Sequence, residues 1–532
     1  MSTDHIPFKE TNYFSDLICD YLAEKDELKE FYHRFPKLEN FEAQIKEKKA
    51  SFNAQSRTVL VDSLKNQYKH IETSELTASH IESLADDNTF TITTGHQLNL
   101  FTGPLYFLYK IISTINLAKQ LKATYPNYHF VPIYWMASED HDFEEINYFN
   151  FKGKKIQWNS EQTGAVGHFS TDGLEAVFNV VSSEFGAGKH AEQLKKWFKE
   201  AYLGHTNLAD ATRYLANALF GSQGLVILDA DAKALKNEFI PQMTTELRDQ
   251  TAFKTVSETN LKLEDLGLKI QVNPREINLF YINDGMRERI VEHDGVYSVL
   301  ETKIQWNATE LIEHLNEFPE RFSPNVIMRP LYQEVILPNL CYIGGGGEMI
   351  YWLQLKSNFE AQKVVFPILL LRNSALIKSQ KQASKLESLQ ISNRDLFLDR
   401  HSFINKKVRN ISNIDIDFSE QIQHLKKQFK ALFDLAEQTD KSFIGAVEAQ
   451  EVKQIKGLKH LEKRLLVAQK RKLADQIERC TVLQEQLFPG ESLQERNTNF
   501  SELYLEYGDQ LILELTKVLQ PLKGEFLILN LK

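Results

Sequence analysis

Cysteine is scarce in this chain of 532 residues, in which only Cys19, Cys341 and Cys480 are present. So few cysteines exclude a disulfide scaffold, and they indicate a reducing compartment. The chain also has no CxxC and no HExxH motif, so the sequence predicts no zinc site built from such ligands. The GxGxxG and GxxxxGK[ST] patterns are missing as well, which removes the usual dinucleotide-binding and P-loop fingerprints.

Long apolar runs are absent too. No stretch approaches 18 unbroken apolar residues, so we expect no transmembrane helix and no membrane partner. Residues 1–10 contain no basic start followed by an apolar segment, so we expect no secretory signal. A cytoplasmic location is the resulting prediction.

The chain has no surplus of positive charge. Its 62 Lys and Arg residues face 72 Asp and Glu residues, which gives a net charge of −10. Nucleic-acid binding needs surplus Lys and Arg, so nucleic acid is not expected as the main partner. The 42% hydrophobic and 25% charged fractions are ordinary for a globular protein with a large core.

What the chain does contain is an α/β pattern in its first two thirds. Residues 1–84 have helical periodicity, and residues 85–375 predict a doubly wound, Rossmann-like core. Segments with alternating strands and turns predict insertions at about 145–220 and 235–325. The expected core strands lie at 89–94, 130–135, 224–229, 325–328 and 364–368.

The last third has a different composition. Residues 376–520 are rich in Lys, Glu, Gln and Leu, and their apolar positions recur about every 3.5 residues, which is typical of a coiled coil. Gly445 and residues 438–441 are expected to mark a turn or weak point, giving an antiparallel helical pair. Such a stripe is either an intramolecular hairpin or a dimerisation arm. The apolar segment at 521–532 is expected to return to the core.

The first candidate site segment follows the strand at 89–94. Ligands of open α/β sheets bind at the carboxyl ends of strands, and the next helix would offer its amino terminus to an anion. His96 could also move a proton; the alternative is an ordinary connecting loop. The candidates here are Gly95, His96, Gln97, Asn99, Thr102 and Gly103.

An acidic turn follows the strand at 130–135. Ser138, Asp140, His141 and Asp142 lie in it, and a carboxylate beside an imidazole can orient it as a general base. The same side chains could hold a divalent cation, or they could form a solvated turn.

Further candidates come later in the chain. Four consecutive glycines cost backbone entropy, so they indicate a tight turn or a ligand held against bare amides. Arginine guanidinium groups pair with carboxylates or phosphates. Asp229 could bind a sugar hydroxyl or the amine of the second ligand, or it could cap a helix. These candidates are Asp229, Arg329, Tyr332, Gly344, Gly345, Gly346, Gly347 and Arg372.

In this order, the segments resemble the cysteine-adding enzymes of bacillithiol biosynthesis, a family of cysteine ligases. The resemblance spans essentially the whole chain, and one departure is His96, where the family commonly has glutamine. The matching motifs are Thr94–Gln97, Leu100–Tyr106 with Tyr109–Lys110, Trp135–Glu145, Leu228–Asp231, Arg329–Glu334 and Gly344–Trp352.

The resemblance implies a Rossmann-like core with connecting-peptide insertions and a coiled coil that forms a homodimer. It also implies the last step of bacillithiol assembly, in which cysteine is joined to glucosaminyl-malate. Amide formation in water is uphill, so ATP is the expected activating cosubstrate. Asp140, His141 or His96 would then move a proton, and Lys110, Arg329 and Arg372 would receive anionic groups. The alternatives are nucleotidyl transfer on the same core and a non-catalytic coiled-coil scaffold.

Overall fold

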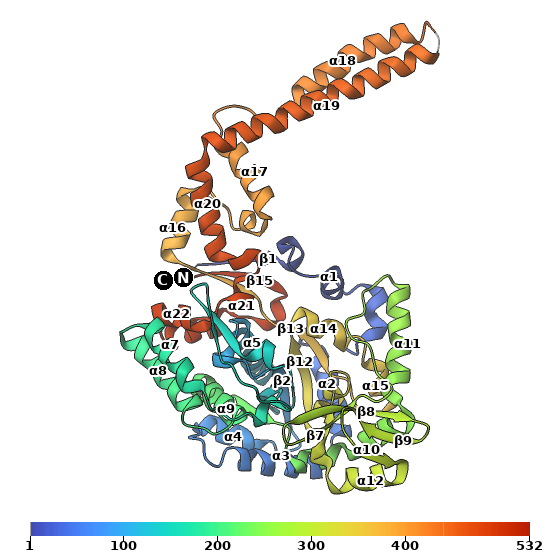
Figure 1. Cartoon of the computed structure of the whole chain (residues 1–532), viewed down its shortest axis with the longest axis vertical. Helices are drawn as coiled ribbons and strands as arrows, with labels where there is room; N and C mark the ends of the chain where they lie inside the picture. Colours follow the sequence, from blue (N-terminus) through green and yellow to red (C-terminus); the bar gives the residue numbers. More distant parts are fainter. Residues whose placement is uncertain (1, 440, 532) are drawn as a thin grey trace.

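The centre of the molecule is a five-stranded parallel sheet with the order β13-β12-β2-β3-β6 (Figure 1). The computed structural model describes residues 2–439 and 441–531. Chain order runs outward from β2 in one direction through β3 and β6, and in the other through β12 and β13, so the topological switch point lies between β2 and β12. The strands are β2 (Thr89–His96), β3 (His129–Met136), β6 (Val226–Asp229), β12 (Asn339–Gly344) and β13 (Ile368–Leu371).

Strand β2 is buried along its whole length, as expected for a central strand rich in β-branched residues. Helix α5 (Tyr106–Thr124) connects it to β3 and packs on both strands. Leu117 and Leu121 of α5 share a buried cluster with Phe90 and Ile92 of β2. The amino-terminal helices complete the core; they are α1 (Asp16–Leu22), α2 (Asn40–Ser51), α3 (Ala54–Gln67) and α4 (Glu75–Ser83).

Two insertions interrupt the sheet. The first follows β3, and the second, which follows β6, carries an antiparallel sheet with the order β10-β9-β8-β7-β11. The first contains α6 (Phe143–Ile146), β4 (Tyr148–Phe151), β5 (Lys154–Gln157), α7 (Leu174–Phe185), α8 (Lys189–Tyr202) and α9 (Leu208–Phe220). The second contains α10 (Lys233–Asp249), α11 (Thr251–Asp265), β7 (Leu279–Asn283), β8 (Met286–His293), β9 (Val296–Val299), β10 (Gln305–Asn307), α12 (Ala308–Glu317) and β11 (Phe322–Pro324). The chain re-enters the core through α13 (Met328–Ile336), and α14 (Gly346–Trp352) and α15 (Lys356–Ala361) follow β12.

The carboxyl-terminal third forms an arm and then returns to the core. Helices α18 and α19 project away from the rest of the molecule as an intramolecular pair (Figure 1), which buries Phe429, Ala436 and Val447. The last strand, β15, lies between β1 and β14 in a three-stranded sheet. The elements are β1 (Ser2–Pro7), β14 (Ala375–Ser379), α16 (Gln380–Ser388), α17 (Arg400–Ile411), α18 (Ser419–Ala436), α19 (Lys441–Lys472), α20 (Ala474–Leu487), α21 (Gln494–Asn497), α22 (Phe500–Tyr507), α23 (Gln510–Val518) and β15 (Glu525–Leu531).

Several local predictions were wrong. Residues 325–328 form no strand, because the Asn325 side chain accepts hydrogen bonds from the amides of Ile327 and Met328 and starts α13. The fourth core strand is β12 instead, and the strand expected at 364–368 begins only at Ile368. Residues 2–7 form a strand rather than a helix, because they pair with β15.

The predicted turn of the arm is partly confirmed. Gly445 lies inside α19 and makes no turn. Helix α18 ends at Ala436 and α19 begins at Lys441, so the chain reverses between them; Asp440 of the predicted turn lies outside the described residues. Within residues 2–439 and 441–531, no helix is both long and apolar enough to cross a membrane.

Candidate active site

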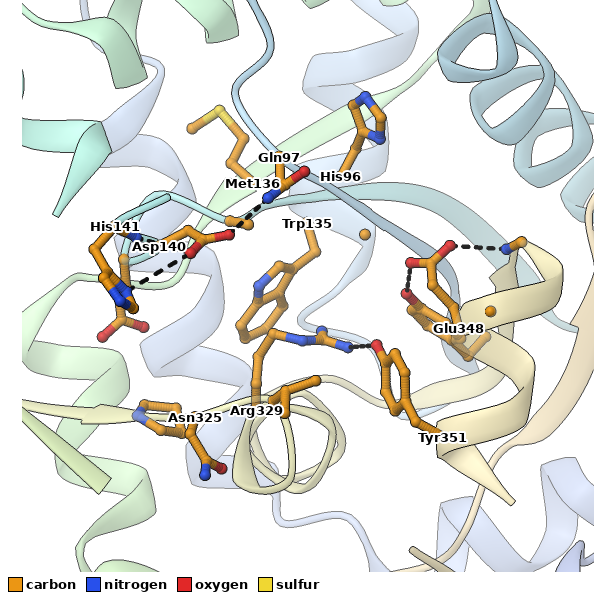
Figure 2. A pocket seen from close by; sticks show the side chains of 18 of the residues that line it. His96, Gln97, Trp135, Met136, Asp140, His141, Asn325, Arg329, Glu348 and Tyr351 are labelled. Carbon is orange, nitrogen blue, oxygen red and sulfur yellow. Dashed lines mark hydrogen bonds and ion pairs between the residues drawn. The ribbon is translucent and has the colours of Figure 1, made fainter. Parts of the chain in front are cut away.

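A cavity of about 750 Å³ opens at the carboxyl ends of β2, β3 and β12. This position is the topological switch point, where ligands of doubly wound sheets bind. The core supplies the floor, β7 and β8 of the second insertion supply one wall, and α14 supplies another. Figure 2 shows Asp140 and His141 on one side of the cavity and Glu348 on the other, with Arg329 between them.

The cavity is strongly cationic, although the chain as a whole is acidic. Seven Lys or Arg side chains line it against three carboxylates. Only Lys110 and Arg372 have a carboxylate partner within 4 Å among the described residues. The other five cations are Arg275, Arg287, Arg289, Arg329 and Arg496. Unpaired guanidinium groups facing one cavity favour an anionic ligand.

Asp140 and His141 form a polar group with the strand-end residue Gln97. The Asp140 carboxylate accepts hydrogen bonds from Nε2 of Gln97 at 2.9 Å and from the His141 amide at 2.8 Å. Arg287, which lies 4.0 Å above the Phe280 ring, donates to Nδ1 of His141 at 2.6 Å. Burial and the Arg287 charge lower the pKa of His141 below 6.5. The imidazole is therefore neutral at pH 7, as a general base must be.

Arg329 occupies the middle of the cavity. Its guanidinium lies 5.9 Å from the Trp135 ring and 5.7 Å from the Tyr342 ring. Nη2 donates to the Tyr351 hydroxyl and Nη1 to Oε1 of Gln333, each at 3.2 Å. These contacts fix the guanidinium without neutralising it, which suits it to bind a substrate anion.

Glu348 anchors the opposite side. Its carboxylate accepts from Nζ of Lys110 at 2.6 Å, from the Tyr342 hydroxyl at 2.8 Å and from the Gly345 amide at 2.8 Å. Burial opposes ionisation, but Lys110 and these hydrogen bonds hold the pKa of Glu348 below its usual range. A fixed negative charge here can receive a substrate ammonium group.

The glycine run borders the cavity beside Glu348. Gly345, Gly346 and Gly347 line it, and none of them has a positive φ. A tight turn therefore does not explain the run. A Cβ added to Gly347 would meet no atom within 4 Å, so the backbone of Gly347 faces open space, whereas a Cβ added to Gly345 would meet Glu348 and Arg372.

The structure brings most of the predicted site residues together. Eleven of them line the cavity: Gly95, His96, Gln97, Lys110, Asp140, His141, Arg329, Gly345, Gly346, Gly347 and Arg372. The remaining eight lie outside its lining: Asn99, Thr102, Gly103, Ser138, Asp142, Asp229, Tyr332 and Gly344.

Three of these eight hold neighbouring parts of the fold. Ser138 donates to Asp229, whose other oxygen lies 3.6 Å from Arg213, so these partners hold the Asp229 carboxylate outside the cavity lining. Tyr332 donates to the Ala230 carbonyl and packs edge-on against Trp135.

Gly344 and Asp142 also lie outside the cavity lining. The Gly344 carbonyl accepts from the Arg372 amide at 2.8 Å. Asp142 is exposed at the start of α6.

The loop before α5 does not form the expected phosphate site. Asn499 donates to the carbonyls of Phe101 and Gly103, and the Leu105 amide donates to the Thr498 carbonyl. The carboxyl-terminal segment therefore covers this loop. Asn99 and Thr102 face a separate small cavity, which they share with His96.

His96 is buried against the rings of Tyr106 and Phe107. Burial, with the charges of Lys110 and Arg372 beside it, lowers the pKa of His96 well below 6.5. The side chain is neutral and enclosed, which fits a wall position better than proton transfer.

Sequence reasoning missed several lining residues. Glu348 and Tyr351 lay inside the Gly344–Trp352 motif, so their polarity was an available signal, and Asn325 was assigned to a strand. Arg287, Arg289 and Phe280 lie on β7 and β8, and nothing in their local sequence indicates that this insertion folds over the acidic turn. Glu139 also lines the cavity, where the buried Lys236 holds its carboxylate.

No group of three or more His, Cys, Asp or Glu side chains is placed to hold a metal ion within the part of the chain that the structure describes. The acidic turn contributes only Asp140 and His141 to the cavity besides Glu139. Acid–base chemistry and anion binding are the uses that this donor set supports directly.

Comparison with known proteins covers the whole chain. Residues 1–373 match the family model described as "Bacillithiol biosynthesis BshC, N-terminal Rossmann-like domain", and residues 375–531 match "Bacillithiol biosynthesis BshC, C-terminal coiled-coil domain". Relatives named "Putative cysteine ligase BshC" are similar throughout. The protein from Christiangramia forsetii is 60% identical, covering 100% of this chain and 99% of that relative. The one from Flavobacterium johnsoniae is 57% identical, covering 100% of both. These matches confirm the Rossmann-like and coiled-coil architecture predicted from the sequence, and the chain belongs to the BshC family of bacillithiol biosynthesis.

Proposed function

We propose that this ligase joins the carboxyl group of cysteine to the amino group of glucosaminyl-malate in the cavity at the switch point. The observation that carries the proposal is the set of five cations without carboxylate partners around one cavity. Glucosaminyl-malate brings two carboxylates, and cysteine brings one, so the substrates match this charge. The names of the relatives support cysteine ligation as the reaction class.

Activation of the cysteine carboxyl is the second part of the proposal. A free carboxylate does not form an amide with an amine in water, because the reaction is uphill. A cysteine carboxylate oxygen attacking the α-phosphate of ATP would release pyrophosphate and give an acyl adenylate. Attack on the γ-phosphate would release ADP and give an acyl phosphate. The amine then displaces AMP or phosphate. The arginines of the cavity would neutralise the phosphate charges.

Proton transfer is assigned to the Asp140–His141 pair. The attacking amine must lose a proton as the amide forms, and a neutral imidazole with a neighbouring carboxylate can accept it. Arg287 already donates to Nδ1 of His141, so Nε2 carries the imidazole proton in this arrangement. Asp140, whose oxygens accept from Gln97 and the His141 amide, is the group with free acceptor capacity. We therefore assign Asp140 as the group that accepts the proton of the attacking amine. His141 helps to position the Asp140 carboxylate.

At the opposite wall, Glu348 would receive the cysteine ammonium group. Its carboxylate is held by three donors and stays ionised. Arg329, fixed between Trp135 and Tyr342, would hold a malate carboxylate. This arrangement places the amine and the activated carboxyl between the two walls, where proximity replaces a bimolecular encounter.

The experiment is mass spectrometry of reactions containing the purified protein, cysteine, glucosaminyl-malate and ATP, with omission of each in turn. Bacillithiol is expected only from the complete mixture. Formation without ATP would remove the adenylate and acyl phosphate mechanisms. A nucleotide-linked product formed without cysteine would indicate nucleotidyl transfer, and no product under any condition would refute the ligase.

Single substitutions test the site assignment. Asp140→Asn and Arg329→Ala are each expected to reduce kcat/KM at least 100-fold, because each removes a charged group that touches a substrate. Circular dichroism and the melting temperature check that the variants are folded. Normal turnover in both variants would overturn the assignment, and a non-catalytic scaffold would tolerate both.

We also propose a homodimer and a cytoplasmic location. A homodimer would use the exposed apolar side chains of the arm, among them Leu435, Val452 and Leu461, which are about half exposed. A cytoplasmic location would supply ATP and keep the cysteine substrate reduced.

A further inference from the structure

One wall of the cavity comes from the carboxyl-terminal third of the chain, beyond the helical arm. Residues 494–499, which include α21, return from α20 and lie against the core (Figure 1). Arg496 of this segment lines the cavity. We call residues 494–499 the strap.

Buried side chains fasten the strap to three parts of the core. Gln494 accepts from the Ile377 amide of β14 at 2.9 Å and donates to the Ile377 carbonyl at 3.0 Å. Asn499 donates to the carbonyls of Phe101 and Gly103 in the loop before α5. Because these amides are buried and paired at both ends, the backbone that carries Arg496 is held rigidly.

Glu495 supplies the third attachment. Its fully buried carboxylate accepts from the Ala375 amide at 2.9 Å and from Ser374 at 3.0 Å, and it pairs with Arg372 at 2.8 Å. Arg372 also lines the cavity, where its guanidinium lies 5.1 Å from the Tyr106 ring. The strap thus contributes one carboxylate, and the ion pair with Arg372 neutralises its charge.

The positive charge of Arg496 in the strap is not balanced by a neighbouring carboxylate in the part of the chain that the structure describes. Arg496 has no carboxylate within 4 Å among the described residues, and it is exposed at the rim of the cavity. Tyr106 and Arg372 line the same cavity as Arg496, and the Arg372 guanidinium lies 5.1 Å from the Tyr106 ring. Two guanidinium groups that line one wall of a cavity favour binding of an anionic group there.

We propose that Arg496 binds an anionic group of a substrate at this wall, and that Glu495 is the positioning residue that holds Arg372 at the same cavity. The carboxyl-terminal third is then part of the binding site as well as the base of the arm. The inference rests on the proposed function for the identity of the substrates. The ligand chemistry is a carboxylate or phosphate oxyanion, supplied by malate or by ATP.

The test measures KM for cysteine, glucosaminyl-malate and ATP separately in Arg496→Gln, Arg496→Lys and Arg479→Gln. Arg479 is the matched control, because it is exposed on α20 and does not line the cavity. Arg496→Gln is expected to raise KM for one anionic substrate about tenfold, the effect of losing one charge-assisted hydrogen bond, with kcat within about twofold. Arg496→Lys should restore part of the loss, and Arg479→Gln should change nothing.

A binding measurement separates this inference from the ligase assignment. The melting temperature of each protein is recorded with L-malate alone and with ATP alone. The wild type is expected to be stabilised by at least one of them, and Arg496→Gln is expected to lose that shift; malate indicates a carboxylate subsite and ATP a phosphate subsite. If the wild type makes no bacillithiol but shows this dependence on Arg496, the ligase fails and the subsite stands. The inference is overturned if neither anion shifts the wild-type melting temperature, or if Arg496→Gln matches the wild type in every KM and every shift.

Discussion

At the residue scale, the contact between Arg287 and His141 makes a prediction about pH. Burial and the Arg287 charge lower the pKa of His141, so the neutral imidazole persists to pH values below 6.5. If neutral His141 is required, the acidic limb of kcat/KM lies below pH 6.5 in the wild type. Arg287→Gln removes the positive charge, raises the pKa of His141 and moves that limb to higher pH. A pH profile of kcat/KM measures the shift.

Arg289→Gln is the control for this profile. Arg289 lines the same cavity and lies two residues along the same strand, but only Arg287 donates to His141 among the hydrogen bonds of the described residues. Both variants lose one cation, so both can weaken substrate binding. An equal shift of the acidic limb in the two variants, or no shift in Arg287→Gln, would exclude His141 as the titrating group.

Candidates chosen at or just beyond the carboxyl end of a core strand lie together at the cavity. Gly95, Gln97, Asp140 and Arg372 line it, because the carboxyl ends of parallel strands meet at one edge of a sheet. Arg287 could not be found in this way, because its approach to His141 depends on how the second insertion packs.

At the element scale, a substitution in the glycine run is expected to lower activity without lowering stability. Gly347→Ala adds a Cβ that meets no atom within 4 Å and favours the helical backbone, so the melting temperature should not fall. Gly347 lines the cavity, so a methyl group there would hinder a substrate that approaches this backbone, and kcat/KM is expected to fall at least tenfold. Unchanged kcat/KM would show that no substrate approaches this backbone.

Gly445→Ala is the counterpart on the arm. Gly445 lies inside α19, and its added Cβ also meets nothing within 4 Å. This substitution should stabilise the helix by about 0.5–1 kcal/mol without altering kcat/KM. Thermal unfolding and the standard assay measure both quantities.

The same scale shows which elements the sequence could predict. Strands β2, β3 and β6 follow from short β-branched runs that end in polar loops. The pairing of β1 with β15 joins residues more than 500 positions apart, so no local pattern predicts the strand at Ser2–Pro7. At residues 325–328, three consecutive apolar residues favour a strand. The chain begins a helix instead, because the Asn325 side chain accepts hydrogen bonds from the amides of Ile327 and Met328.

At the scale of the whole molecule, the arm predicts an oligomeric state. Leu461 on α19 is 52% exposed although the arm already buries an internal seam, so an apolar face remains for a second copy. Leu461→Lys is expected to convert a dimer to a monomer in sedimentation velocity. Leu513→Lys, on the core helix α23 with a similar exposure of 48%, should leave the dimer intact. A monomeric wild type, or equal effects of the two substitutions, would refute dimerisation through the arm.

We propose that the cysteine carboxyl is activated and transferred in the switch-point cavity. The most direct measurement uses cysteine with both carboxyl oxygens labelled with ¹⁸O, together with glucosaminyl-malate and ATP, and mass spectrometry of every product. We expect bacillithiol with one ¹⁸O in its new amide and the other ¹⁸O in AMP or phosphate, and we expect Arg329→Ala to form both labelled products at least 100-fold more slowly. Absence of bacillithiol, or bacillithiol whose formation leaves no ¹⁸O in AMP or phosphate, would contradict this proposal.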